Sequence, residues 1–354
     1  MSFELGKTIG GYEFVDILES TRNAVVYRVR NLAARRFEML RVLAPALQED
    51  PVRVERFMRE GKILSRMSHP NIITLYSAQT LEGQLVMTTE VLEGSTLAQR
   101  VEVGPMPWPE ACGYFRQMLS ALGYAHSQGI VHREITPSSV LVTPDGVVKL
   151  VNFGLAKGPT DPRVTVAGAV LGPLYYMSPE QVKGVELGPR SDIYSAGVAL
   201  YKVLTGRVPF DRASQFDVML AHVQAEAVPP STINRAVPPE FDSVIQRAMG
   251  KEPEQRFATA EEFLDALEAV RLGLEGVQVI VTAPGAPAAA PVQPAFTPAP
   301  VEAEPSASGT GAPPMQAPLA GVVAAATPRM MLAGILIFLV TLLALIALLK
   351  AVRS

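Results

Sequence analysis

Short apolar runs alternate with polar residues over the first ninety positions and predict a strand-rich region. The runs contain many β-branched residues, which favours strands in segments of this length. One longer segment, Glu49–Met67, spaces its apolar residues at helical intervals among charges and predicts an amphipathic helix that ends before Pro70. The strands that we expect are Tyr12–Leu18, Ala24–Val29, Phe37–Leu43, Ile72–Leu75 and Leu85–Leu92.

From Leu97 to about Val270 the apolar spacing becomes helical and predicts a larger region made mainly of helices. Ser191 is placed to cap one of these helices, and Gly206 lies where the same helix is expected to end. The expected helices are Trp108–Ser127, Ser191–Leu204, Phe241–Met249 and Ala260–Leu272. The pattern therefore predicts an α+β protein with a small β-rich lobe and a larger helical lobe.

A short hairpin is expected inside the helical region. Val140–Val142 and Val147–Val151 are apolar runs joined by Thr143-Pro144-Asp145-Gly146, and Asp-Gly tolerates the positive φ that hairpin turns need. The polar loop His132–Ser139 precedes the hairpin, and Asn152-Phe153-Gly154 follows it. Two polar loops on either side of a hairpin are the strongest candidate in the chain for a functional site.

The C-terminal part changes character twice. Residues 282–328 contain eleven prolines, many alanines and two acidic residues, which predicts an extended, disordered tether, with a ligand for a proline-recognition module as the alternative. Met330–Leu349 has no charged residue and, at about 1.5 Å a residue, reaches roughly 30 Å, the thickness of a bilayer core. A buried core helix would show a polar stripe, so we expect a transmembrane helix.

Flanking charges do not orient that helix, because Arg329 lies on one side and Lys350 and Arg353 on the other. The N-terminus lacks the apolar stretch of a signal peptide. We therefore expect a single-pass membrane protein whose N-terminal part lies in the cytoplasm. Only Lys350–Ser354 follow the helix, so we expect any signal to arrive from the cytoplasm or through the membrane helix.

The overall composition excludes some partners. A net charge of −3 argues against a nucleic-acid footprint, which needs clustered lysine and arginine. Cys112 is the one cysteine, so no intramolecular disulfide can form, and its helical context indicates a buried apolar side chain. Lys149 is expected to be a solvated surface residue, with phosphate ligation as the alternative.

Several motifs resemble those of the eukaryotic-type serine/threonine protein kinases of bacteria. Tyr175–Gln181 is similar to the end of an activation segment, Ser191–Gly197 to the start of the central helix, and Pro253–Phe257 to the segment that carries a paired arginine. The resemblance implies a bilobal kinase fold over Tyr12–Leu272, with structural roles for Glu180, Asp192 and Arg256, and a buried ion pair between Glu180 and Arg256.

With the composition, the resemblance divides the chain into four parts. They are an N-lobe over 12–91, a C-lobe over 92–272, a Pro/Ala-rich linker over 273–328 and a transmembrane helix over 329–350.

In the small lobe, the resemblance implies a nucleotide site whose key residues are replaced. Glu19, Thr21 and Ala24 stand where three glycines would let backbone N–H groups approach the phosphates. Arg41 replaces the lysine that grips the phosphates, and Met39 crowds the adenine pocket. An ion pair between Arg41 and Glu60 is expected. The positions that the resemblance assigns to the nucleotide are Val26, Arg41, Glu60, Thr89, Glu90, Val91 and Leu141.

The catalytic positions are also altered. Glu134 stands where the resemblance places an aspartate as general base, after Arg133, which would bind a phosphorylated activation loop. Thr136 replaces the loop lysine. Ser139 and Asn152 replace the asparagine and aspartate that hold Mg²⁺, a cation that prefers anionic oxygen ligands. Gly172-Pro173-Leu174 departs from Gly-Thr-Pro, and Thr165 matches a phosphorylated threonine of related kinases.

These replacements lead to three hypotheses. The first is a membrane-tethered pseudokinase that acts as a scaffold or allosteric regulator, whose partners are active kinases, their substrates or other membrane signalling proteins, and for which we expect no cofactor. The second is an active or weakly active serine/threonine kinase that uses ATP with Mg²⁺, Glu134 as base and Arg41 on the phosphates. The third keeps a nucleotide as a structural ligand without metal, against which Glu19 and Met39 argue.

Overall fold

The computed structural model describes residues 3–156, 158 and 173–276 of the 354. Thr165, most of the Pro/Ala-rich segment and Met330–Leu349 lie outside the described residues. Among the described residues no helix has the length and apolarity needed to cross a bilayer.

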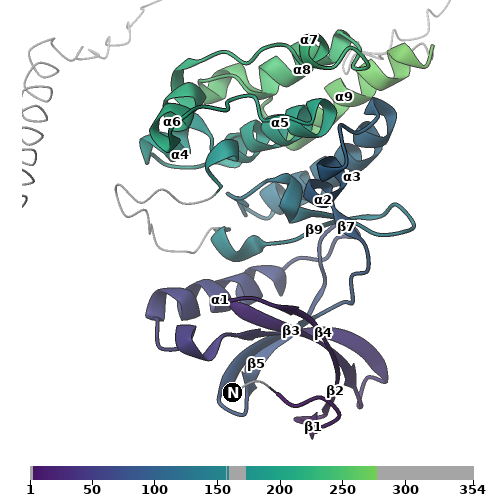
Figure 1. Cartoon of the computed structure of the whole chain (residues 1–354), viewed down its shortest axis with the longest axis vertical. Coiled ribbons are helices and arrows are strands. Elements are labelled where there is room, and N and C mark those ends of the chain that lie inside the picture. Colours follow the sequence, from purple (N-terminus) through teal and green to yellow (C-terminus); the bar gives the residue numbers. More distant parts are fainter. Residues whose placement is uncertain (1–2, 157, 159–172, 277–354) are drawn as a thin grey trace, which may run out of the picture. The chain divides into compact units, whose positions relative to one another are not determined.

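A six-stranded antiparallel sheet forms the small lobe, at the bottom of Figure 1. Its strand order is β1-β2-β3-β4-β6-β5. Tyr27, Val29, Leu40 and their neighbours alternate inward and form its apolar core. Helix α1 (Pro51–Leu64) covers one side, and Asp50 caps it by accepting from the N–H groups of Val52 and Arg53. The strands are β1 (Thr8–Ile9), β2 (Tyr12–Ser20), β3 (Ala24–Asn31), β4 (Arg36–Leu43), β5 (Leu75–Leu81) and β6 (Gln84–Thr89).

Three sequence-based expectations for this lobe were wrong in detail. The strand expected over Ile72–Leu75 instead begins at Leu75, because Ile72 bridges to Leu150 of the helical lobe and is buried there. The helix expected to reach Met67 ends at Leu64. The lobe also starts before Tyr12, since β1 pairs with β2 and Phe3 packs in the core.

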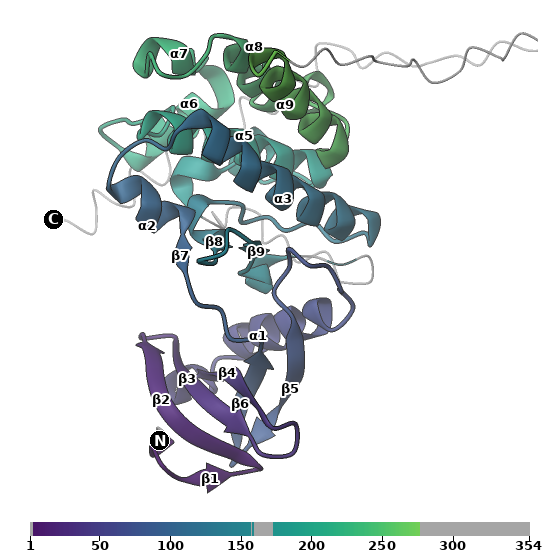
Figure 2. The ribbon, with the colours of Figure 1, turned by 90° about the vertical axis from the view of Figure 1, so that its right-hand side faces the viewer.

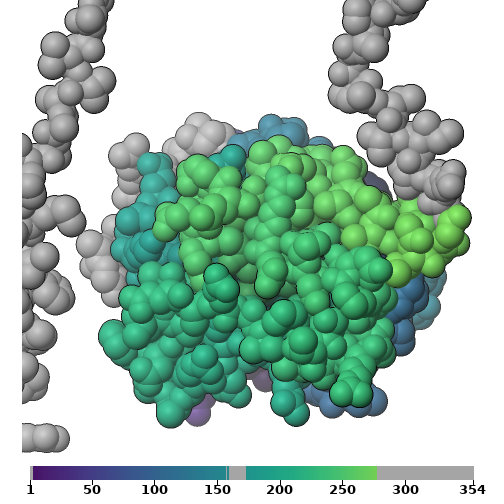
Figure 3. Space-filling model, turned by 90° about the horizontal axis from the view of Figure 1, so that it is seen from above, coloured from purple at the N-terminus to yellow at the C-terminus, as the bar shows by residue number. Residues whose placement is uncertain are grey.

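The helical lobe surrounds α5, whose residues are almost all buried. Gly197 lets α8 approach α5 closely, because a Cβ there would lie 2.8 Å from that of Ala248. The helices are α2 (Leu97–Glu102), α3 (Trp108–Ser127), α4 (Pro179–Lys183), α5 (Pro189–Thr205), α6 (Gln215–Gln224), α7 (Pro230–Ile233), α8 (Glu240–Ala248) and α9 (Ala260–Leu274). In the view from above, the residues of the helical lobe form the near face and almost hide the strands of the small lobe (Figure 3).

A three-stranded sheet lies between the six-stranded sheet and the helices (Figure 2). It consists of β7 (Ser95–Thr96), β8 (Val140–Val142) and β9 (Val148–Leu150), and the last two form the predicted hairpin. Short 3₁₀ helices connect the larger elements: Pro45–Leu47, Pro137–Ser139, Phe153–Leu155, Leu174–Tyr176 and Pro253–Gln255.

Two further boundaries differ from expectation. Helix α5 is capped by Gly188, and Ser191 lies inside the helix, where its hydroxyl donates to Glu180 rather than capping. Helix α9 continues to Leu274, so the linker does not start at residue 273. Gly206, with φ of 73°, ends α5 as predicted.

Candidate functional site

A cavity of about 580 Å³ lies between the lobes, where the kinase resemblance places a nucleotide. Of the residues predicted for the nucleotide, Val26, Arg41, Glu60, Thr89 and Leu141 line it, as does Asn152. Glu90 and Val91 do not belong to this lining, although they follow Thr89 directly. The fold therefore keeps a cleft large enough for a small ligand.

Met39 contacts the strip that joins the lobes. The backbone N–H of Leu92 donates to the Met39 sulfur at 3.3 Å, and both residues line the cavity. A thioether sulfur is a weak acceptor, and here its donor is a backbone N–H that faces the cleft. Met39 thus occupies a backbone donor, and takes up volume, in the pocket that the resemblance assigns to adenine.

The Glu90 carboxylate connects two segments of the chain, one at Thr74 and one at Lys149. Its Oε1 accepts from the Thr74 N–H and from Lys149 Nζ, both at 2.8 Å. Lys149 is largely buried in this ion pair, so the expectation of a solvated surface lysine was wrong. Both contacts of the Glu90 side chain are within the protein, which indicates a structural role.

Arg41 and Glu60 form the ion pair that the resemblance implies. Arg41 Nη2 lies 2.5 Å from Glu60 Oε2, and Glu60 is nearly buried. The guanidinium also lies over the ring of Phe57, 5.2 Å from its centroid. Strand β4 and helix α1 are therefore joined by a charge pair as well as by apolar packing.

Thr136 and Ser139, two of the replaced catalytic positions, bond to each other. The Ser139 hydroxyl accepts from the Thr136 N–H at 2.9 Å and donates to the Thr136 carbonyl at 2.8 Å. Ser139 is fully buried. Its oxygen therefore stabilises the loop and has little capacity left to coordinate a metal ion.

Asn152 adopts a left-handed conformation with φ of 67° at the start of the Phe153–Leu155 turn. Asparagine tolerates this conformation better than most residues. Asn152 lines the cavity, at the position that the resemblance assigns to a second metal ligand. Ser139 and Asn152 together present no negative charge, and such a pair does not fit Mg²⁺.

Glu134, at the position of the base, pairs across the lobes with Arg56 of α1. Arg56 Nη2 lies 3.4 Å from Glu134 Oε2, longer than the usual charge-assisted bond. Burial raises the pKa of the Glu134 carboxyl, while Arg56 opposes that shift. A cavity of about 300 Å³ opens beside this pair, under α1.

Asp192 organises the loop beneath the cleft. Its carboxylate accepts from the N–H groups of His132 at 2.8 Å and Arg133 at 2.7 Å, and pairs with His126 Nε2 at 2.8 Å. Burial alone would raise the Asp192 pKa, but the hydrogen bond and charge of His126 and the contacts of His132 hold it below its ordinary value. Helix α5 thereby fixes the backbone of Arg133, whose φ is 67°.

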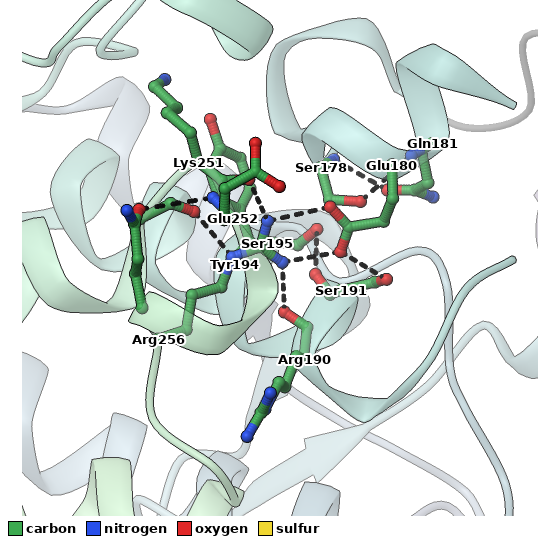
Figure 4. Close-up of polar contacts among 12 residues, drawn as sticks. Ser178, Glu180, Gln181, Arg190, Ser191, Tyr194, Ser195, Lys251, Glu252 and Arg256 are labelled. Carbon is green, nitrogen blue, oxygen red and sulfur yellow. Dashed lines mark hydrogen bonds and ion pairs between the residues drawn. The ribbon is translucent and has the colours of Figure 1, made fainter. Parts of the chain in front are cut away.

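Glu180 and Arg256 form the buried ion pair that the resemblance implies (Figure 4). The guanidinium donates to both carboxylate oxygens, at 2.6 and 2.8 Å, and to the carbonyls of Arg190, Gly250 and Lys251. Burial by itself raises the Glu180 pKa, but Arg256 and the Ser191 hydroxyl outweigh it, so the pKa falls. This network joins α4, α5 and the loop before α9.

Arg56 is the residue of this region that sequence reasoning missed. It lies one helical turn before Glu60, and residues at i and i+4 share a helix face. That spacing indicates that Arg56 also faces the cleft. Its contact with Glu134, 78 positions away, required the tertiary structure.

Comparisons with known proteins show the family to which the chain belongs. The family model described as "Protein kinase domain" matches residues 12–266. The chain is 34% identical over 260 residues to serine/threonine-protein kinase PrkC of Bacillus subtilis, covering 73% of this chain and 40% of that protein. It is 35% identical over 268 residues to PknB of Mycobacterium leprae, covering 74% and 43%. The chain therefore spans less than half the length of these relatives.

The fold is also similar to a solved structure. The crystal structure of the Mycobacterium tuberculosis PknI kinase domain matches with a TM-score of 0.60 and 26% identity, covering 76% of this chain and 99% of that one. The match therefore covers almost the whole of that kinase domain.

Proposed function

The chain belongs to the bacterial eukaryotic-type serine/threonine protein kinase family, and from that premise we propose that it is a membrane-anchored pseudokinase that acts as a signalling scaffold or allosteric regulator. Members of this family use ATP with Mg²⁺, and phosphoryl transfer depends on positioned phosphate, metal and base groups.

One observation carries the proposal: the groups at the metal, base and adenine positions bond to other residues of the chain. The Ser139 oxygen is bonded to Thr136, Glu134 is paired with Arg56, and the Leu92 N–H donates to Met39. By resemblance, these groups stand at the positions for metal, base and adenine. Loss of all three functions in one cleft is expected to abolish efficient transfer.

An assay of γ-phosphate transfer tests this proposal directly. The full chain, purified in detergent, is expected to show no autophosphorylation and no transfer to a generic protein substrate with Mg²⁺ or Mn²⁺. A variant with Glu134→Asp, Thr136→Lys, Ser139→Asn and Asn152→Asp restores the base and metal residues, and transfer by this variant would assign the missing activity to those positions. Transfer by the wild type at an ordinary kinase rate, abolished by Glu134→Ala, would overturn the proposal.

The anchor is a separate part of the proposal, supported by the uncharged run Met330–Leu349. Two arginines at the centre of such a helix each oppose insertion by about 2.5–3.5 kcal/mol. Leu339→Arg with Leu342→Arg is therefore expected to move the protein from the membrane to the soluble fraction. Equal membrane recovery of the variant and the wild type would contradict the anchor.

Tethering supports the choice of partners that we propose. A protein held at the membrane meets neighbouring signalling proteins at raised effective concentration. We therefore expect active kinases or their substrates as partners, and phosphorylation of Thr165 by such a kinase. Crosslinking in membranes, with the soluble variant above as control, is expected to lose these partners when the anchor is lost.

A second candidate function is an active or weakly active kinase. The open cleft and the Arg41–Glu60 pair favour it, because both are parts of an assembled small lobe. In this case Glu134 acts as base, and autophosphorylation on Thr160 or Thr165 depends on Mg²⁺ or Mn²⁺. Mass spectrometry after incubation with ATP and each metal distinguishes this function from the first.

A further inference from the structure

The cavity under α1 differs in character from the nucleotide cleft beside it. Its volume is about 300 Å³, and its lining contains three arginines, Arg41, Arg53 and Arg56, with two carboxylates, Glu60 and Glu134. The lining thus carries one more positive than negative charge. Arg41, Glu60 and Asn152 line both cavities, so the two are adjacent.

Arg56 places its guanidinium beside the segment Asn152-Phe153-Gly154. A Cβ built on Gly154 would lie 3.1 Å from Arg56 Nε and 3.3 Å from Glu60 Oε2. Active kinases hold a metal ion at the corresponding segment to neutralise phosphate charge. In this chain a side-chain cation therefore lies next to the place where a divalent cation is otherwise required.

The contacts of Arg56 leave it able to bind an anion. Its bond to Glu134 is long, at 3.4 Å, and a guanidinium has five N–H donors in a planar fork that matches phosphate oxygens. Both side chains are partly exposed, so water also competes for this contact. A phosphate group would be a stronger partner.

Arg53, one helical turn earlier, is also loosely held. Its Nε lies 4.0 Å from Asp50 Oδ2, the outer limit of an ion pair. The other Asp50 oxygen accepts from the backbone of Val52 and Arg53 as the cap of α1. Arg53 and Arg56, spaced i and i+3, therefore present two guanidinium groups from one helix face to the cavity.

We propose that this cavity is a metal-independent site for a phosphoryl anion, with Arg53, Arg56 and Arg41 as its ligands. The chemical class is a pyrophosphate group, free or as the tail of a nucleotide whose remainder lies in the adjacent cleft. This inference rests on the proposed function, because a cleft that does not transfer phosphate has no need of a catalytic metal.

Calorimetric titration of the full chain in detergent tests the site with two probes. Inorganic pyrophosphate and ATP are each titrated in EDTA and then in excess Mg²⁺. Binding is expected in EDTA, with an affinity that falls as salt is raised because the ligands are partly exposed. Pyrophosphate binding alone identifies the anion as sufficient, and tighter binding of ATP identifies a nucleotide tail.

Matched variants locate the site. Arg53→Gln and Arg56→Gln are each expected to weaken pyrophosphate binding at least about tenfold, as the loss of a charge-assisted hydrogen-bonding group does. Lys62→Gln removes the same charge from the exposed face of α1 and is expected to leave binding unchanged. Equal loss in all three variants would indicate a general charge effect and overturn the site.

Two other outcomes separate this inference from the proposed function. Absence of pyrophosphate and ATP binding overturns the site but leaves the scaffold proposal intact, since a scaffold needs no ligand. Binding of ATP that requires Mg²⁺ and survives Arg53→Gln overturns the site and also favours the active-kinase alternative.

Discussion

Charged residues are held differently in two regions, the interior of the helical lobe and the cleft at its border with the small lobe. Beneath the cleft, Glu180, Asp192 and Arg256 are almost fully buried and make several bonds each, most at 2.6–2.8 Å. At the cleft, Arg56 and Glu134 remain 38% and 22% exposed and lie 3.4 Å apart.

The difference follows from the cost of burying charge. A buried charge that loses its partner keeps the full desolvation cost, whereas water replaces the partner of an exposed charge. The interior network therefore maintains the kinase fold, while the cleft can change its residues with little loss of stability. Four predictions test this contrast.

The largest effect is expected from Arg256→Ala. It leaves Glu180 buried without its partner and should lower the free energy of unfolding by about 3–5 kcal/mol. Urea unfolding followed by the fluorescence of Trp108, which packs on Phe241, measures this. Arg190→Gln is the control, because its side chain pairs weakly with Glu254 at 3.9 Å and points away from the network (Figure 4). Equal losses in both variants would contradict the contrast.

The second prediction concerns pH and the buried His222. Burial, and then the charge of Lys251, lowers the pKa of His222 to about 4 from 6.5. The unfolded chain therefore takes up a proton as pH falls below 6.5, while the folded one does not. This stability contribution is complete above pH 6.5 and is lost as pH falls toward 4, by about 2 kcal/mol between pH 7 and pH 5.

Urea unfolding at pH 7 and pH 5 measures that loss. His132, whose pKa burial also lowers, adds to it in the same direction. His222→Gln is expected to reduce the pH dependence, and His69→Gln, at a less buried site, to reduce it less. An unchanged pH dependence in His222→Gln would show that the interior tolerates a new charge.

The third prediction concerns the adenine side of the cleft. Met39→Ala removes the sulfur that accepts from the Leu92 N–H and should raise the affinity for adenosine about tenfold, by freeing a donor and space. Calorimetric titration measures the affinity. Met87→Ala enlarges the same cavity without touching that N–H and is the control. An equal gain in Met87→Ala would assign the effect to volume alone.

The smallest effect is expected when the pair across the lobes is removed. Arg56→Gln and Glu134→Gln should each change the free energy of unfolding by less than about 1 kcal/mol, because both side chains are partly exposed. The same urea experiment measures this. A loss comparable to that of Arg256→Ala would remove the distinction between the two regions.

Much of the fold was predictable because local patterns agree with it. The helix over Trp108–Ser127, the hairpin around Asp145-Gly146 and the end of α5 at Gly206 follow from periodicity and turn chemistry. Ile72 and Ser191 were misassigned for a shared reason. Each follows a local signal, but a distant partner, Leu150 or Glu180, decides its conformation.

The candidate site was predictable as a set of positions. Motif resemblance assigned Arg41, Glu60, Glu134 and Asn152 to one cleft, and the structure brings all four to the lining of one cavity. The motif resemblance did not indicate that Ser139 forms hydrogen bonds within its own loop, or that Lys149 pairs with Glu90. Hydrogen-bond partners depend on distances between side chains that spacing along the chain does not specify.

The sequence by itself determined the kinase architecture and, through the motif resemblance, predicted that the phosphate, metal and base residues are replaced, because residue types at motif positions are local information. The tertiary structure alone decided what those positions contact. Arg56 meets Glu134 because the small lobe places α1 against the loop of the helical lobe, 78 positions later in the chain. Such a contact depends on the packing of two lobes, which neither segment encodes separately.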